Sequence, residues 1–233
     1  MGWFRFKNKD SRDFGILLSS VPQKTRPERR IEHITIPGRS GDLTQDEETY
    51  EPYTISLECS TRGSDRLDEI VEWLNGAGEL VLFTEPDKAY KASIYNKISI
   101  ADMIYLYNSF LLQFRVQPFK YSVNAFNDII EIPAGIPKTV IHNKGTVYSE
   151  PIITVYAKGS CMLSLNGTMM ALKDIGGHIT IDSEMMEVYQ DGENANSKFT
   201  TTGDFPIFEV GENHLTIMGT VEKIVIEPKW RWL

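Results

Sequence analysis

The sequence has little cysteine and no long hydrophobic run. The two cysteines, Cys59 and Cys161, are far apart and form no Cys-x-x-Cys motif, so we interpret them as buried apolar side chains and leave a long-range disulfide open. No stretch approaches the length needed to cross a bilayer, and residues 1–7 lack the apolar run and cleavage site of a secretory signal. We therefore expect synthesis in the cytoplasm and no membrane partner.

Positive charge is also scarce. The chain has 24 Lys and Arg against 32 Asp and Glu, a formal net charge of −8. Tight binding of nucleic acid needs clustered cations that neutralise phosphates, so this balance disfavours a nucleic-acid-binding protein, although DNA could still pass along an acidic wall. With 233 residues, 41% of them hydrophobic, the chain can form two modest domains or one large all-β domain.

Motifs for catalysis and metal binding are largely missing. The nearest approach to a hydrolase nucleophile is Ser40 within Gly38-Arg39-Ser40-Gly41-Asp42, but the second glycine comes one position early and no strand-to-helix turn follows. The four histidines lack the close spacing of a zinc site; they are His33, His142, His178 and His214. We predict that the protein is not an enzyme and has no catalytic residue, cofactor or bound metal.

Two acidic segments need a separate interpretation. The oxygens of Asp191, Glu193, Asn194 and Asn196 could bind calcium weakly, but they lack the ligand order of an EF-hand, so a solvated loop is the preferred interpretation. The run Asp46–Glu48 is interpreted as solvated surface.

In the first half of the sequence, apolar and polar residues alternate in several segments, as they do in strands, and one segment has the spacing of a helix. Strands are expected at 53–59, 79–84, 89–100 and 104–118. The helix is expected over 65–75, capped by Ser64 or Asp65 and stopped by the glycines at 76 and 78, with Trp73 packing beside an apolar stripe. The stripe consists of Leu67, Ile70, Val71 and Leu74.

A change of pattern divides the chain. Residues 119–127 lack periodicity and Pro133–Pro137 marks a turn, which predicts domains at 1–128 and 129–233. The second domain has short strands separated by glycine turns, as a β-sandwich does, at 139–142, 151–157, 161–165, 178–182, 187–190, 214–217 and 221–228. The last strand, about 221–233, either belongs to this sandwich or returns to the first domain.

The segment from Arg29 to Leu43 is the most informative part of the chain. Ile31, Ile34 and Ile36 favour extended backbone. Pro37-Gly38 and Gly41 are turn-forming residues and indicate a small charged loop after this strand. Ordering such a polar excursion costs entropy that nothing local offsets, so a neighbouring subunit or a ligand often rigidifies it. The alternative is a mobile surface loop.

The chain ends in an aromatic tail. Trp230 and Trp232 alternate with Lys229 and Arg231, which places both indoles on one side of an extended segment. Such a pair can contact a glycan or a partner protein, but we prefer the interpretation that the indoles dock the last strand onto the body of the protein.

Several motifs, in their order and spacing, resemble the distal tail proteins (the Dit family) of long-tailed bacteriophages, the siphoviruses, or of prophages. The resemblance covers the whole chain and is strongest over the first third. It is carried by Phe14-Gly15-Ile16, Arg29 to Leu43, Trp73-Leu74-Asn75-Gly76, Pro118-Phe119-Lys120-Tyr121, Asn143-Lys144-Gly145, Glu150-Pro151-Ile152, Ile181-Asp182, Gly203-Asp204-Phe205-Pro206, Gly211-Glu212-Asn213 and Ile224 to Pro228.

The resemblance implies a mainly β fold, in which an amino-terminal β domain with one helix forms a ring and a galectin-like β-sandwich follows. It implies a hexameric hub in the virion tail tip, assembled in the host cytoplasm, that joins the tail tube protein to a tail-associated tip protein and leaves a channel for DNA. A receptor-binding protein is a further candidate partner, and DNA would pass without specific binding. The alternative function is a carbohydrate-binding module for host cell-wall glycan.

The ring-forming parts are expected to be the helix at 65–75 and the segment 29–43. The candidate interface residues are Arg29, Ile31, Ile34, Ile36, Arg39, Asp42 and Leu43, and the candidate glycan or partner contacts are Trp230 and Trp232. An acidic channel wall would repel DNA and let it slide.

Overall fold

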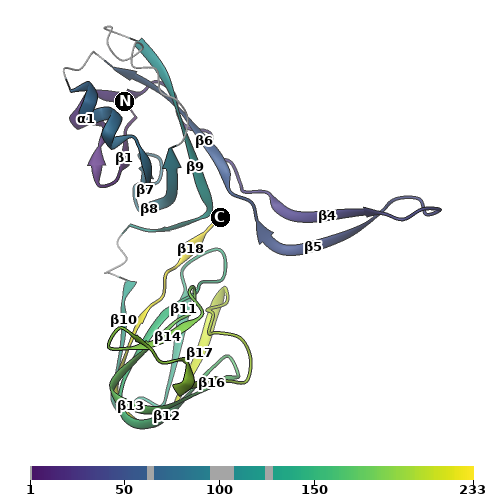
Figure 1. Ribbon diagram of the computed structural model, residues 1–233, viewed down its shortest axis with the longest axis vertical. Coiled ribbons are helices and arrows are strands. Elements are labelled where there is room, and N and C mark those ends of the chain that lie inside the picture. Colours follow the sequence, from purple (N-terminus) through teal and green to yellow (C-terminus); the bar gives the residue numbers. More distant parts are fainter. Residues whose placement is uncertain (1, 62–65, 95–107, 124–127) are drawn as a thin grey trace. The chain divides into compact units, whose positions relative to one another are not determined.

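The computed structural model describes residues 2–61, 66–94, 108–123 and 128–233 (Figure 1). These residues are mainly in strands, with one α-helix among them, so the predicted fold class is confirmed. The chain forms two compact units, Met1–Val123 with Leu233 and Asn124–Trp232, each with its own hydrophobic core.

The first unit is built on one antiparallel sheet, in the order β2-β1-β7-β8-β9-β6-β3. In β6, Ile55, Leu57 and Cys59 are buried while the residues between them are more exposed, as the predicted alternation requires. The elements are β1 (Phe4–Phe6), β2 (Lys9–Asp10), the 3-10 turn η1 (Ser11–Phe14), β3 (Ile16–Leu18), β6 (Tyr53–Thr61), α1 (Leu67–Trp73), β7 (Gly76–Leu82), β8 (Lys88–Ile94) and β9 (Asn108–Ser122).

Helix α1 packs on this sheet mainly through Trp73. The indole stacks on Phe14, with ring centroids 4.5 Å apart, and on Phe4 at 5.6 Å. Its Nε1 donates a hydrogen bond of 2.7 Å to the carbonyl oxygen of Phe6, so the polar atom of this buried ring is satisfied. The interpretation of Trp73 as a packing residue is confirmed.

The helix differs from the sequence prediction in its bounds and in the width of its apolar stripe. The helix ends at Trp73. Strand β7 begins at Gly76, whose φ is 79°, and so starts three residues before the predicted strand. Val71 is exposed, so the apolar stripe is narrower than predicted. The proposed caps Ser64 and Asp65 lie outside the described residues, as do 95–100 and 104–107 of the predicted strands.

Replacing Trp73 by alanine tests the core of the first unit. We expect Trp73→Ala to lower the free energy of unfolding by about 3 to 5 kcal/mol, because it removes two ring stacks and leaves a cavity. Urea titration followed by circular dichroism measures the change. The control Val71→Ala, on the same helix but exposed, should stay within about 0.5 kcal/mol; equal effects would contradict this packing.

The second unit is a sheet in the order β10-β17-β12-β13-β14-β15, with β11 also paired to β17 and β16 to β13. Its core includes the fully buried side chains of Ile153, Leu163 and Phe208. The elements are β10 (Ile130–Pro133), β11 (Lys138–Asn143), β12 (Ile152–Leu165), β13 (Thr168–Asp182), β14 (Glu187–Gln190), β15 (Glu193–Asn194), η3 (Asn196–Lys198), β16 (Phe199–Thr201), β17 (Gly211–Glu227) and β18 (Arg231–Trp232).

Strands predicted as separate are continuous in this unit. The predicted pair 151–157 and 161–165 is the single strand β12, and 214–217 with 221–228 is β17. The register of β12 shifts between Gly159 and Cys161 on its β13 side. β17 pairs with β11 through its first half and with β10 through its second. Of the glycines predicted as turns, Gly167 and Gly192 lie in turns, whereas Gly176 and Gly177 lie within β13. The predicted last strand, about 221–233, is divided in the structure: residues 221–227 lie in β17 and pair with β10 and β12 of this unit, and β18 is a separate strand.

Gly219 provides a test of this arrangement. Its φ is +100°, and an added Cβ would lie 3.2 Å from the backbone of Ser160 and Cys161. We expect Gly219→Ala to reduce stability by about 1 to 3 kcal/mol, because both the conformation and the space disfavour a side chain. Thermal unfolding measures this loss of stability. Gly203→Ala is the control, because φ is not positive there and the added Cβ would lie 3.5 Å from the nearest atom. A Gly219→Ala protein as stable as the control would contradict the prediction.

Both cysteines are free and buried, which confirms their interpretation as apolar side chains. Burial raises the pKa of the Cys59 thiol to about 12 and that of Cys161 to about 11. Both thiols are therefore protonated at neutral pH and poor nucleophiles.

Strands β4 (Arg29–Thr35) and β5 (Asp42–Tyr50) form a separate two-stranded sheet, the hairpin. Figure 1 shows it as a ribbon that no other strand flanks. Residues 42–50 were predicted as a charged loop and acidic surface. They are exposed but extended, because the turn at 36–41 brings them into register with β4.

Candidate interaction surfaces

The hairpin brings every predicted interface residue together. Ile34 lies opposite Leu43 and Thr35 opposite Asp42, so Ile34, Ile36 and Leu43 share one face of the ribbon. Ile31 lies opposite Asp46 on the other face. Arg39 is in the turn, where its backbone N–H donates to the carbonyl oxygen of Ile36.

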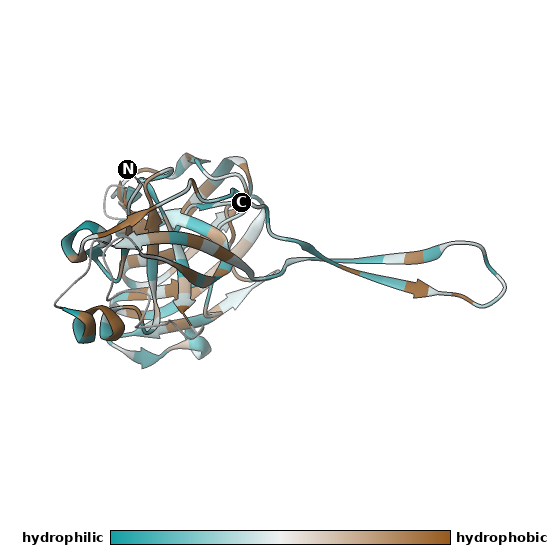
Figure 2. Cartoon of the chain, turned by 90° about the horizontal axis from the view of Figure 1, so that it is seen from above, coloured by the Kyte–Doolittle hydropathy of each residue, from teal (hydrophilic) through white to brown (hydrophobic). Residues whose placement is uncertain are grey.

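The apolar side chains of the hairpin are poorly covered. Ile31 is 44% exposed, Ile36 37% and Leu43 46%. Figure 2 shows the corresponding hydrophobic bands on both strands. A two-stranded ribbon is at best marginally stable in water, because it has no second layer against which to bury these groups. Exposed apolar groups on an unflanked ribbon are typical of a surface that a partner covers.

Ion pairs hold the base of the hairpin in register. Arg29 Nε donates to Asp46 at 2.8 Å, across a β-bulge, and Arg30 pairs with Glu51 at 2.5 Å. The pKa of Asp46 is lowered, first by a hydrogen bond from the backbone of Glu48 and then by Arg29. Because these charges are exposed, the pairs add little stability but favour one register over others.

An aromatic contact ties the hairpin base to the sheet of the first unit. The ring of Tyr50, the last residue of β5, meets Phe119 of β9 edge-on, with centroids 5.8 Å apart. The backbone N–H of Glu51 donates to the carbonyl oxygen of Glu28 at 2.8 Å. The hairpin is thus anchored at its base, while its outer part has no such contact among the described residues.

The carboxyl-terminal tail is packed. Trp230 is only 2% exposed, and its ring lies 5.6 Å from that of Phe208. Trp232 is half-buried and packs against the same core. Trp230 has no open face on which a sugar could stack, which corrects its candidate role as a glycan contact; the preferred docking interpretation agrees with the burial.

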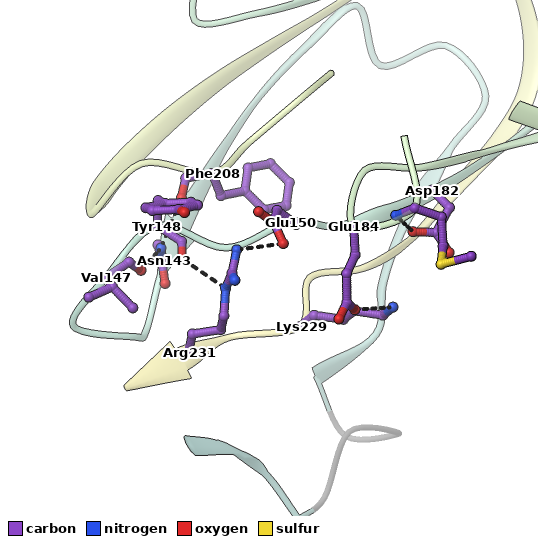
Figure 3. A network of polar contacts seen from close by, with 10 residues as sticks. Asn143, Val147, Tyr148, Glu150, Asp182, Glu184, Phe208, Lys229 and Arg231 are labelled. Carbon is purple, nitrogen blue, oxygen red and sulfur yellow. Dashed lines mark hydrogen bonds and ion pairs between the residues drawn. The ribbon is translucent and has the colours of Figure 1, made fainter. Parts of the chain in front are cut away.

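Polar contacts fix the tail in the second unit (Figure 3). Arg231, almost fully buried, donates through Nε to the carbonyl oxygen of Tyr148 at 3.2 Å and pairs with Glu150 at 2.9 Å. Asn143 donates to the carbonyl oxygens of Val147 and Phe208. Lys229 pairs with Glu184 at 3.3 Å in a more exposed position.

The acidic loop near Asp191 is engaged internally. Asn194 donates to Glu187, and the side-chain oxygen of Asn196 accepts from the backbone N–H of Val188 at 2.6 Å. Lys198 donates to Gln190 at 2.7 Å, which places a cation beside the oxygens. In the described part of the chain, no group of three or more His, Cys, Asp or Glu side chains could hold a metal ion.

Comparisons with known proteins identify the fold. No family model matches the chain, and no curated protein sequence does. A crystal structure does match: that of the Dit protein (gp 19.1) of phage SPP1, described as a paradigm of the hub adsorption apparatus in phages that infect Gram-positive bacteria. The match covers 100% of both chains with a TM-score of 0.79 and 14% sequence identity. This chain has the fold of SPP1 Dit.

The match confirms the resemblance to Dit proteins at the level of fold. It extends over the complete length of both chains, so it includes both units and the region of the hairpin. Among the described helices, none is long and apolar enough to cross a membrane.

The buried Arg231–Glu150 pair provides a test of the tail. We expect Glu150→Ala to lower the stability of the second unit by about 1 to 3 kcal/mol, because a buried guanidinium loses its ionic partner; Glu150 is itself partly exposed, which moderates the loss. Glu184→Ala, which removes the exposed partner of Lys229, should cost less than about 1 kcal/mol. Urea midpoints compare the two variants, and the reverse order would contradict the proposed anchoring.

Proposed function

We propose that this protein is a structural hub of a phage tail tip. Six copies form a ring through their amino-terminal units, which joins the tail tube protein to the tail-associated tip protein and any receptor-binding protein. The ring leaves a channel through which DNA passes without specific binding. The full-length fold match to a phage hub protein is the observation that carries the proposal.

The hairpin supports an assembly role. It gathers the predicted interface residues on one ribbon, exposes three apolar side chains and has open edges on both strands. Such a surface is costly for an isolated protein and useful in an assembly, where a neighbour covers it. A ring of identical copies needs two different surfaces on each copy, and an extended hairpin is suited to be one of them.

The chemistry of the chain supports a structural role over catalysis. Ser40 lies in the exposed hairpin turn, and no residue of the hairpin belongs to the core of the first unit. The net charge of −8 would favour passage of DNA over retention if acidic groups line the channel. We therefore propose a non-enzymatic component of the virion, assembled in the host cytoplasm.

Deleting the hairpin tests the assembly role. We expect the purified wild-type protein to form six-fold rings with a central hole in negative-stain electron microscopy, with a hexamer mass in solution. Replacing residues 31–48 by an Asn-Gly turn should yield monomers, because the interface is removed, and these monomers should still unfold cooperatively on heating, because the hairpin adds nothing to either core. A deletion variant that still forms rings would contradict the role of the hairpin, and wild-type particles of another symmetry would contradict the hexamer.

A further inference from the structure

The chain contains two Asn-Gly dipeptides, Asn75-Gly76 and Asn166-Gly167, whose side chains have different surroundings. An asparagine before a glycine can lose its side-chain amide, because the glycine has no Cβ to keep its backbone nitrogen away from the amide carbon. In a folded protein, the rate depends on how freely these two atoms approach each other. Both dipeptides are exposed and both follow a leucine, so solvent access and local sequence do not distinguish them.

The side chain of Asn166 is held at both ends. Asn166 and Gly167 form the tight turn between β12 and β13, with φ values of 51° and 94°. The Nδ2 of Asn166 donates to the Oδ1 of Asn213 at 2.8 Å, and its Oδ1 accepts from the backbone N–H of His214 at 2.8 Å. Asn213 is fully buried, so loss of the amide would leave it without this donor. The two bonds keep the amide carbon of Asn166 away from the nitrogen of Gly167.

The side chain of Asn75 has no such restraint. Its amide group makes no hydrogen bond to the described part of the chain; its backbone carbonyl oxygen accepts one, from the Nζ of Lys7. Asn75 lies between the end of α1 and the start of β7, where Gly76 pairs with Ile94, the last residue of β8. The ends of elements open more readily than their centres, so Asn75 and Gly76 can move without separating the rest of the sheet.

Lys7 places a cation on the peptide bond that would react. It lies in the turn between β1 and β2, and its ammonium donates to the carbonyl oxygen of Asn75. That oxygen belongs to the same peptide unit as the backbone nitrogen of Gly76. A cation on the oxygen stabilises the negative charge that develops on this unit when the nitrogen loses its proton. Lys7 Nζ also lies 3.8 Å from the position that a Cβ on Gly76 would take.

We propose that Asn75 is a site of deamidation, that Lys7 promotes the reaction, and that Asn166 is protected by its hydrogen bonds. The backbone nitrogen of Gly76 loses its proton to hydroxide and attacks the Cγ of Asn75. The bond between this nitrogen and Cγ forms, the bond from Cγ to Nδ2 breaks, and the amide leaves as ammonia with a proton from water. Water then opens the ring at either carbonyl carbon and yields aspartate or isoaspartate. The inference does not depend on the proposed ring.

The product changes the junction between α1 and β7. The new carboxylate adds a negative charge at the carboxyl end of α1, where the helix dipole disfavours an anion and the ammonium of Lys7 offsets it. Isoaspartate also adds a backbone carbon between the helix and the strand. Chemical ageing of the folded protein therefore begins at this junction.

Peptide mapping by mass spectrometry tests the selection between the two dipeptides. The full-length protein is kept in mildly alkaline buffer, and the fraction of aspartate plus isoaspartate is followed at Asn75 and Asn166. We expect deamidation about tenfold faster at Asn75 in the folded protein, because only its amide carbon can reach the glycine nitrogen. In concentrated urea the two rates should become similar. Equal rates in the folded protein, or a difference that persists undiminished in urea, would overturn the proposal.

Replacing Lys7 tests its role. Lys7→Met removes the ammonium but keeps an aliphatic side chain, and it should slow deamidation at Asn75 about threefold to tenfold, because the developing charge loses its cation. Lys7→Arg keeps the positive charge and should retain most of the wild-type rate. The control is Lys9→Met, which removes a lysine of β2 whose Nζ lies over the ring of Phe14, and it should leave the rate unchanged.

A purely structural role of Lys7 would give a change of the opposite sign. If Lys7 only held the end of α1 in place, Lys7→Met would loosen Asn75 and speed up its deamidation. A rate in Lys7→Met that equals or exceeds the wild-type rate would therefore overturn the promoting role. Deamidation at Asn166, measured in the same samples, should be the same in all of these variants, because its restraints lie within the second unit.

Discussion

A two-stranded ribbon cannot bury its own side chains, and this constraint connects the other features of the molecule. The hairpin has aliphatic groups on both faces and no second layer, so its folded form is stable only when another surface covers it. Its base is held by Tyr50 against Phe119 and by exposed ion pairs, which set its register but add little stability. The two cores are complete without it. The hairpin is therefore best explained as part of an assembly.

Much of the fold could be predicted where the pattern was local. The alternation in β6 and the apolar spacing around Ile70 and Trp73 indicated the strand and the helix, because each element buries one face against a core. Strand β5 was missed, since its run of Asp and Glu between 46 and 48 lacks an apolar alternation. What makes it a strand is its pairing with β4, a contact that the turn at 36–41 allows and that residue type alone does not reveal.

The glycines of the second unit show the opposite error. Gly176 and Gly177 were predicted to form a turn before a short strand, yet they lie within the long strand β13. Only tertiary pairing distinguishes these cases, because a glycine at positive φ serves a tight turn and a bulge equally well. The same holds for the candidate interface: sequence identified the residues of the hairpin, but only the structure shows which of them lie opposite one another. Trp230 was expected to dock the last strand onto the protein, and it is buried with Phe208 packed against it.

The central claim is that a neighbouring copy covers the hairpin in the assembled protein. Hydrogen–deuterium exchange of the backbone amides of residues 29–50 measures this most directly, when the dilute monomer and the assembled protein are compared. The account predicts rapid exchange at the outer part of the hairpin in the monomer and strong protection there in the assembly. Equal exchange of the hairpin amides in both states would contradict it.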